Sequence, residues 1–315
     1  MRYKFSYQFL YPKYWLVWIG ILLLFLYFLL PSCIKNPFIK YIAKTKYKKK
    51  SKRYHIIKKN IQTCFADKDK DEQERMIQQN FEYAVQTYSD LPLLWWGRKS
   101  TIKNKIKIIA LGKLKKLHSE NKKIILLTCH SLPVEYGPIA INTELPIITM
   151  VNDFRNPLVN WLVNKGRGRF NLSLISRADG IKPILKSIKK NNIFVYAPDE
   201  DTGKTKSVFA PFFGTEKATL SALKSLLKIT DAVVYPLWTY YDKKNKNYKA
   251  VIGEQILFSQ NMNEVEFATQ MNKEIEKLIN ISPAQYMWGM RIFKKRPMNK
   301  FDKNGNKIKF YKYDK

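Results

Sequence analysis

The chain has 315 residues, and its hydrophobic content of 45% supports a sizeable core and argues against global disorder. Lysine and arginine total 57 against 25 aspartate and glutamate, which gives a formal net charge of +32. That excess leaves three classes of partner, namely nucleic acid, an anionic membrane and a phosphorylated substrate, although a lysine-rich coding bias also raises such a charge. The spacing of Cys33, Cys64 and Cys129 argues against a disulfide framework and against a cysteine metal site.

The N-terminal region contains a run of 21 residues without charge, from Tyr14 to Ile34. A helix of that length rises about 31 Å, close to the hydrocarbon thickness of a bilayer, and Trp15 and Trp18 suit the interface at one end. We therefore predict an N-terminal segment, 1–34, with one transmembrane helix at about 14–34. A cleaved signal peptide would need a small-residue cleavage site that is missing here, whereas a lipoprotein signal at Cys33 is a closer alternative.

Basic residues flank this run unequally. Three precede it, and nine follow within about 20 residues, from Lys35 to Arg53. The positive-inside rule therefore places the C-terminal part in the cytoplasm as a single-pass protein. The basic juxtamembrane segment, 35–60, is expected to lie along an anionic membrane surface, where each lysine gains about 1 kcal/mol. A solvated linker is the alternative.

Further along the chain, helical and strand-like patterns alternate. Two helices are predicted within 54–90, the second from Asp71 to Tyr88, followed by an apolar patch at 91–98. Short apolar runs predict strands at 106–110, 124–128, 147–151, 172–175, 193–197 and 233–238, and amphipathic stretches predict helices at 181–190, 219–229 and 263–280. The alternation predicts an α/β domain with a largely parallel central sheet flanked by helices. We place it at 61–298, before a polar, basic and disordered tail at 299–315.

One strand ends at His130, and Glu135 follows five residues later, after Pro133, which suits the first turn of a helix. Ligands bind α/β sheets where strands end and helices begin. A histidine there can accept a proton from a hydroxyl, and a nearby carboxylate can orient the ring. On spacing alone the signal is weak, because a lone histidine is more often structural and an acidic residue in a first helical turn usually serves the helix dipole. Cys129 points to the opposite face of the strand and is predicted to be buried.

A second block, 151–170, is rich in arginine. Its candidates for gripping phosphate or stabilising an oxyanion are Arg155, Arg167 and Arg169, with an ordinary basic helix face as the alternative.

A third block, 192–214, runs from a predicted buried strand into a polar loop that contains Asp199, Glu200 and Asp201. An Asp-x-Asp pair could hold a divalent metal with a nucleotide sugar, as in a glycosyltransferase. The apolar stretch at 208–213 suits an acyl chain or a membrane better.

Together these blocks resemble the lipid A biosynthesis acyltransferase family of the lauroyl and myristoyl type, a branch of the lysophospholipid acyltransferase superfamily. The resemblance covers nearly the whole chain and rests on five ordered elements, which are Asn60-Ile61-Gln62-Thr63-Cys64-Phe65, His130 with Glu135, Asn156-Pro157 with Arg167 and Arg169, Tyr196-Ala197-Pro198-Asp199-Glu200-Asp201 with Phe209-Ala210-Pro211-Phe212-Phe213, and Pro283, Gln285, Tyr286, Trp288, Arg296 and Pro297. The chain departs from the family pattern at 131–133 and at 153–155, so the turn after His130 and the role of Arg155 stay open.

The resemblance implies a glycerolipid-acyltransferase-like domain and an enzyme of the inner (cytoplasmic) membrane. Such an enzyme moves a fatty acyl group from an acyl carrier protein thioester to a hydroxyl of a lipid A precursor, in lipopolysaccharide biosynthesis. It implies His130 as general base, Glu135 as the group that orients it, and Arg167, Arg169 and Asp199 as groups that bind the substrate or the oxyanion. Neither a metal nor a redox cofactor is implied.

The implied partners are acyl carrier protein, the lipid A precursor and anionic membrane lipids, without nucleic acid. The alternatives are a lysophospholipid or other glycolipid acceptor, a metal-dependent glycosyltransferase and a membrane-tethered nucleic-acid binder.

Overall fold

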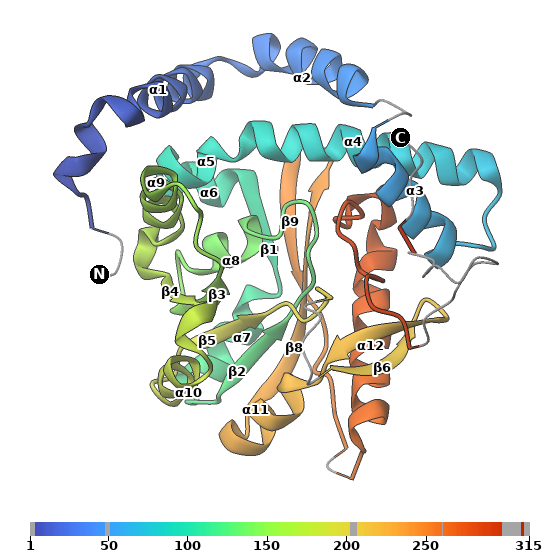
Figure 1. The fold of residues 1–315 in the computed structure, drawn as a ribbon. Helices are drawn as coiled ribbons and strands as arrows, with labels where there is room; N and C mark the ends of the chain where they lie inside the picture. Colours follow the sequence, from blue (N-terminus) through green and yellow to red (C-terminus); the bar gives the residue numbers. More distant parts are fainter. Residues whose placement is uncertain (1–3, 48–50, 202–206, 260, 298–309, 312–315) are drawn as a thin grey trace.

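A mostly parallel sheet of seven strands forms the centre of the computed structural model, which describes residues 4–47, 51–201, 207–259, 261–297 and 310–311 (Figure 1). The strand order is β1-β9-β8-β2-β5-β3-β4. The strands are β1 (Ile106–Ile109), β2 (Ile124–Leu127), β3 (Ile147–Val151), β4 (Ser173–Ser176), β5 (Ile193–Tyr196), β8 (Val233–Asp242) and β9 (Asn247–Ile252). Only β8 and β9 pair antiparallel within this sheet. The prediction of an α/β fold with a largely parallel sheet is confirmed.

Both faces of the sheet are covered, which explains why its central strands are continuous apolar runs. In β2, Ile125 and Leu127 belong to one buried cluster, whereas Ile124 and Leu126 belong to the other. The first cluster packs against α3 (Lys52–Cys64), α4 (Lys70–Asp90), α10 (Lys182–Lys189), α11 (Ala222–Thr230) and α12 (Glu264–Ile281). The second packs against α5 (Pro92–Trp96), α6 (Lys99–Lys105), α7 (Leu111–Ser119) and α8 (Tyr136–Ile141).

An antiparallel hairpin of β6 (Ser207–Phe212) and β7 (Thr215–Leu220) lies beside the sheet. It packs against α12 (Figure 1). The sequence patterns did not predict these two strands or β9. The helix expected at 219–229 begins only at Ala222, because Thr219 and Leu220 belong to β7.

The uncharged N-terminal run forms two helices instead of one, so the expected helix at 14–34 needs correction. Helix α1 (Trp15–Leu29) ends before Pro31, and α2 (Ser32–Lys46) follows it. A residue before proline avoids helical backbone angles, and Leu30 is extended, with φ −63° and ψ 142°. By length and composition, Pro12–Leu29 could cross a bilayer.

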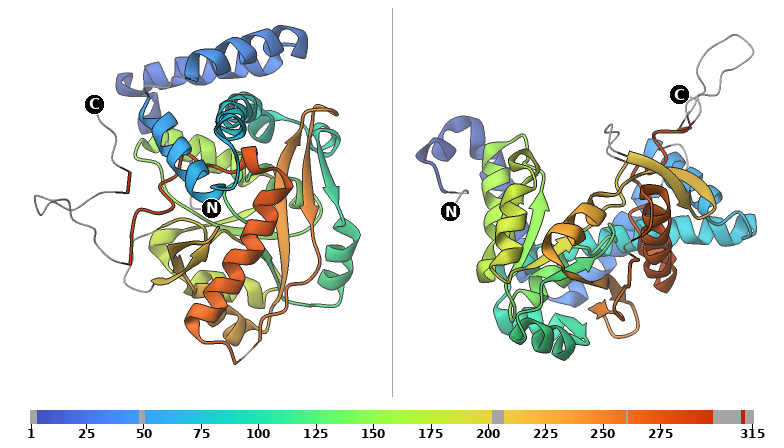
Figure 2. Two further views of the ribbon diagram at one scale, coloured as in Figure 1. Left: turned by 90° about the vertical axis from the view of Figure 1, so that its right-hand side faces the viewer. Right: turned by 90° about the horizontal axis from the view of Figure 1, so that it is seen from below.

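The two helices form an arm on the outside of the domain, and α4 lies between α2 and the sheet (Figure 1 and Figure 2). Helix α1 contacts α5 through Phe25, whose ring centroid is 5.3 Å from that of Trp96. It also approaches α9 (Pro157–Arg167), where the Trp18 and Trp161 rings are 6.3 Å apart. The exposed side of α1 is lined by apolar residues: Leu16, Ile19, Leu22, Leu23, Leu26 and Leu29.

Of the expected domain boundaries, the one at residues 60 and 61 falls within a helix, and the one at 298 and 299 lies outside the described residues. Helix α3 crosses the proposed start at residue 61 and belongs to the first core cluster. The tail at 299–315 lies outside the described residues except for Phe310 and Tyr311. The Phe310 ring lies 5.4 Å from that of Phe293, and the Tyr311 hydroxyl donates to Asn60 Oδ1 at 2.7 Å.

Candidate active site

A cavity of about 1310 Å³ opens where β2, β3, β4 and β5 end. This is the edge at which α/β sheets commonly bind ligands. Its polar lining includes Thr128, His130, Glu135, Asp153, Arg167, Arg177, Glu200, Asp201, Arg291 and Lys294. Its apolar lining includes Ile139, Val151, Leu172, Leu174, Phe194, Val195 and Leu226. The cavity thus combines several charged groups with walls suited to a hydrocarbon chain.

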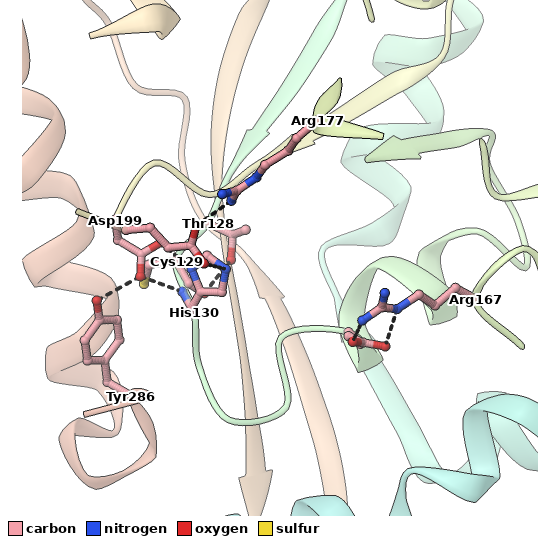
Figure 3. A network of polar contacts seen from close by, with 9 residues as sticks. Thr128, Cys129, His130, Arg167, Arg177, Asp199 and Tyr286 are labelled. Atoms are coloured by element: carbon pink, nitrogen blue, oxygen red, sulfur yellow. Dashed lines mark hydrogen bonds and ion pairs between the residues drawn. The ribbon is translucent and has the colours of Figure 1, made fainter. Parts of the chain in front are cut away.

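Asp199, not Glu135, is the carboxylate that contacts His130 (Figure 3). Oδ1 of Asp199 lies 2.7 Å from Nδ1 of His130, and Oδ2 accepts the backbone N–H of His130 at 2.9 Å. The Tyr286 hydroxyl also donates to Oδ2, at 2.8 Å. Nδ1 can therefore carry the proton and donate it to Asp199, which leaves Nε2 as the acceptor nitrogen. This contact replaces the predicted one with Glu135.

The pair perturbs both pKa values. Burial alone would raise the pKa of Asp199, but the charge of His130 and the hydrogen bonds from His130 and Tyr286 hold it well below its usual range. Burial alone would lower the pKa of His130, but Asp199 and then Glu200 outweigh this and raise it, while Arg177 opposes them. A perturbed histidine of this kind in a cavity is a candidate catalytic base.

Glu135 pairs with Arg167 instead. It directly precedes α8, and Arg167 is the last residue of α9. Nε of Arg167 donates to Oε2 of Glu135 at 3.1 Å, and Nη2 contacts Oε1, so the two groups meet side by side. Figure 3 shows Arg167 well apart from His130 and Asp199. His130, Glu135 and Arg167 line the same cavity, and Asp199 reaches it through His130.

Arg169 lies away from the cavity, which corrects its expected role in substrate binding. Its guanidinium donates to the backbone oxygens of Leu94, at 3.2 Å, and Gly97, at 2.6 Å. The described residues that line the cavity do not include it. Arg169 therefore satisfies carbonyl groups left free at the end of α5.

The segment that carries Tyr286 is held by two buried asparagines. The Asn80 side-chain amide donates to the backbone oxygens of Ala284 and Tyr286, both at 2.8 Å. The Asn60 amide donates to Trp288 O and Met290 O, both at 2.7 Å. These bonds tie two early helices to the C-terminal segment beside the site.

Sequence reasoning did not assign a site role to Tyr286, Arg177 or Glu200. In the sequence, Tyr286 is part of the C-terminal element that resembles the family, without a role of its own. Arg177 follows β4 directly, so the rule that ligands bind at strand ends could have marked it. Cys129 is fully buried, as predicted, and burial raises the pKa of its thiol well above the usual value.

Comparisons with known proteins show the family to which the chain belongs. The pattern of the bacterial lipid A biosynthesis acyltransferase family matches residues 2–295. A lipid A biosynthesis acyltransferase of Haemophilus influenzae is 31% identical over 293 residues, covering 93% of this chain and 92% of the relative. The lipid A biosynthesis lauroyltransferase of Escherichia coli is 31% identical over 296 residues, covering 93% and 96%. The lipid A biosynthesis myristoyltransferase of Escherichia coli is 27% identical over 296 residues, covering 93% and 91%. The chain therefore belongs to the bacterial lipid A biosynthesis acyltransferase family.

Proposed function

We propose that the chain transfers a fatty acyl group from an acyl carrier protein thioester to a hydroxyl of a lipid A precursor. The observation that carries this proposal is the His130–Asp199 pair, whose histidine lines a large, partly apolar cavity. A lipid acceptor and an acyl donor both need hydrocarbon contacts, and the volume exceeds the 300–1,000 Å³ typical of small-molecule sites. We take the acyl acceptor to be a lipid A precursor because the chain belongs to the lipid A biosynthesis acyltransferase family.

In the proposed reaction, Nε2 of His130 takes the proton of the acceptor hydroxyl while its oxygen attacks the thioester carbonyl carbon. Asp199 keeps the proton of the ring on Nδ1 and stabilises the imidazolium that forms. The carbon–sulfur bond then breaks, and the imidazolium returns its proton to the leaving thiolate. Asp199 thus takes the orienting role first expected of Glu135.

We assign Arg167 to the negative charge that develops on the carbonyl oxygen, or to a phosphate of the acceptor. A guanidinium suits both, because it is always charged and binds planar anions through two donors. Glu135 acts through Arg167 by fixing its orientation across the cavity wall. Arg169 acts on the stability of α5 and not on the substrate.

The rest of the chain serves to hold this site at a membrane. We propose a glycerolipid-acyltransferase-like catalytic domain, anchored through α1 in the inner membrane and facing the cytoplasm. The unequal basic flanks support that orientation. The basic surface would meet anionic lipid headgroups and the acidic carrier protein.

The direct test incubates the purified full-length chain with a tetra-acyl lipid A precursor and a panel of acyl carrier protein thioesters. Mass spectrometry should show the acceptor gaining the mass of one acyl group, and the preferred donor reports the chain length. Transfer should persist in excess EDTA, because attack on a thioester needs a base and an oxyanion site. Loss of product with EDTA, restored by added Mn²⁺ or Mg²⁺, would contradict this chemistry. Acylation of a lysophospholipid, but not of the lipid A precursor, would overturn the acceptor.

A further inference from the structure

A second acidic group faces the catalytic nitrogen of His130. Oε1 of Glu200 lies 3.7 Å from Nε2, whereas Asp199 contacts the other ring nitrogen, Nδ1. That distance is too long for a hydrogen bond, but it is short for an interaction between charges. The other oxygen of Glu200, Oε2, lies 2.5 Å from Nη2 of Arg177. The side chains of His130, Glu200 and Arg177 are 20%, 30% and 36% exposed, so the cluster is only partly screened by water.

The position of Glu200 creates a conflict that the reaction has to avoid. A carboxylate beside Nε2 stabilises the protonated ring, which assists removal of the proton from the acceptor. The same carboxylate would occupy Nε2 and exclude the acceptor hydroxyl if it moved about 1 Å closer, into hydrogen-bond range. The ion pair of the other oxygen with Arg177 restrains Glu200 against such a movement.

We propose that Glu200 and Arg177 are positioning residues for His130. Glu200 stabilises the imidazolium, and Arg177 holds Glu200 far enough from Nε2 to leave that nitrogen open to the acceptor. This inference rests on the proposed role of His130 as base. The structure places Arg177 in η4 (Arg177–Asp179), directly after β4, and Glu200 in the loop after β5. The pair therefore joins the ends of two strands that lie on either side of β3.

The other polar groups beside His130 lie on the Nδ1 side of its ring or line the wider cavity. Asp199 and Tyr286 meet the Nδ1 side of the ring. The fully buried Cys129 precedes it in the chain, and Lys217 is coupled to Asp199 and Asp201. The remaining charged cavity residues are Glu135, Asp153, Arg167, Asp201, Arg291 and Lys294. Glu200 forms an ion pair with Nε2, and Arg177 holds the other oxygen of Glu200.

The first test follows the titration of His130 by NMR in the full chain, labelled at histidine and held in detergent. The chain has three histidines, so a His130→Gln spectrum assigns the signal. Glu200→Gln should move the midpoint of His130 to lower pH, by up to about one unit, because a charge that favours the imidazolium is lost. Arg177→Gln should move it to higher pH, because Glu200 can then approach Nε2. Glu135→Gln is the matched control, and it should leave the midpoint in place because its partner is Arg167.

The second test measures acyl transfer by the same variants. Arg177→Gln should lower kcat by at least about tenfold. Adding Glu200→Gln to that variant should restore much of the loss, because the blocking carboxylate is gone. A role of Arg177 in binding a phosphate, or in stability alone, would show no such rescue.

The outcomes separate this inference from the proposed reaction. If neither substitution moves the His130 midpoint, or if the double variant is no better than Arg177→Gln, the positioning roles are wrong, whatever the activity. If both shifts appear but His130→Gln keeps full activity, the pair is as described and the proposed base is wrong, which also removes its positioning role in the reaction.

Discussion

His130 and Asp199 form a pair in which each group fixes the protonation of the other. Asp199 is 1% exposed and accepts hydrogen bonds from His130 and Tyr286, so its charge is compensated inside the protein. Its negative charge in turn raises the pKa of His130. Only the neutral ring can accept a proton, so activity should rise with pH as His130 loses its own proton.

Replacing Asp199 by asparagine tests this coupling. Asp199→Asn removes the charge that raises the pKa of His130, so the acid limb of the kcat/KM profile should move to lower pH. Turnover should fall by about 10²–10⁴-fold, because an amide no longer fixes the tautomer of the ring. A pH profile of acyl transfer measures both effects. An acid limb that stays in place would contradict the pairing.

Replacing Glu135 should affect turnover without changing the pH dependence. Glu135→Gln leaves Arg167 without its charged partner, so kcat should fall by about 10²-fold through loss of oxyanion stabilisation. The acid limb should not move, because the contacts of His130 are unchanged. Steady-state kinetics across pH separates the two effects. A shifted acid limb would restore the direct His130–Glu135 contact that the sequence suggested.

The sequence marked His130, Glu135, Arg167 and Asp199 as candidates, but it paired His130 with Glu135, whereas the structure pairs it with Asp199. A spacing of five residues suggests proximity, yet the loop between His130 and Glu135 is fixed elsewhere: the Leu132 N–H donates to Gln285 O at 2.7 Å. The actual partner, Asp199, follows a strand that is adjacent in the sheet and remote in the chain. Strand order decides such contacts, and a single sequence does not give it.

At the scale of elements, burial on both faces made the central strands β2 and β5 easy to predict, because it makes them continuous apolar runs. β1 to β5 and β8 fall on the expected apolar runs. The β6–β7 hairpin was not predicted, because only two residues separate its strands and Val208–Phe213 has the composition of a single apolar patch. The absence of charge from Tyr14 to Ile34 does not reveal the helix break at Pro31, which follows from the conformational restriction that proline imposes on Leu30.

Arg169 supports an element and not the chemistry. Arg169→Ala should lower the free energy of unfolding by about 1–3 kcal/mol, because Leu94 O and Gly97 O lose their donor. At temperatures where the variant is folded, kcat/KM should stay near the wild-type value. Thermal unfolding in detergent, beside the exposed Arg155→Ala as control, measures the first effect. A large loss of kcat without a loss of stability would return Arg169 to the substrate site.

The N-terminal arm should carry most of the membrane attachment. Deleting residues 1–30 removes the apolar surface of α1 and leaves the lysines of α2. The shortened chain should bind vesicles weakly, only when they contain anionic lipid, and should dissociate in high salt, since screening acts on the remaining charges. Flotation with neutral and anionic vesicles measures this. Full flotation of the shortened chain on neutral vesicles in high salt would show that another surface anchors it.

At the scale of the whole molecule, composition named the classes of partner but could not choose among them. A net charge of +32 fits a membrane, a phosphorylated lipid and a nucleic acid equally. The choice comes from the cavity, which places acid–base groups beside apolar walls at one edge of the sheet. The residues that line the cavity come from strand ends and loops that are far apart in the chain, so only the fold brings them together.

The most direct test of the account compares the wild-type chain with His130→Gln in transfer of an acyl group from acyl carrier protein to the tetra-acyl lipid A precursor. The wild type should add one acyl group, seen by mass spectrometry. His130→Gln should be slower by about 10²–10⁴-fold with the fold intact. Comparable product from the two chains would contradict His130 as the base, and with it the mechanism proposed for this cavity.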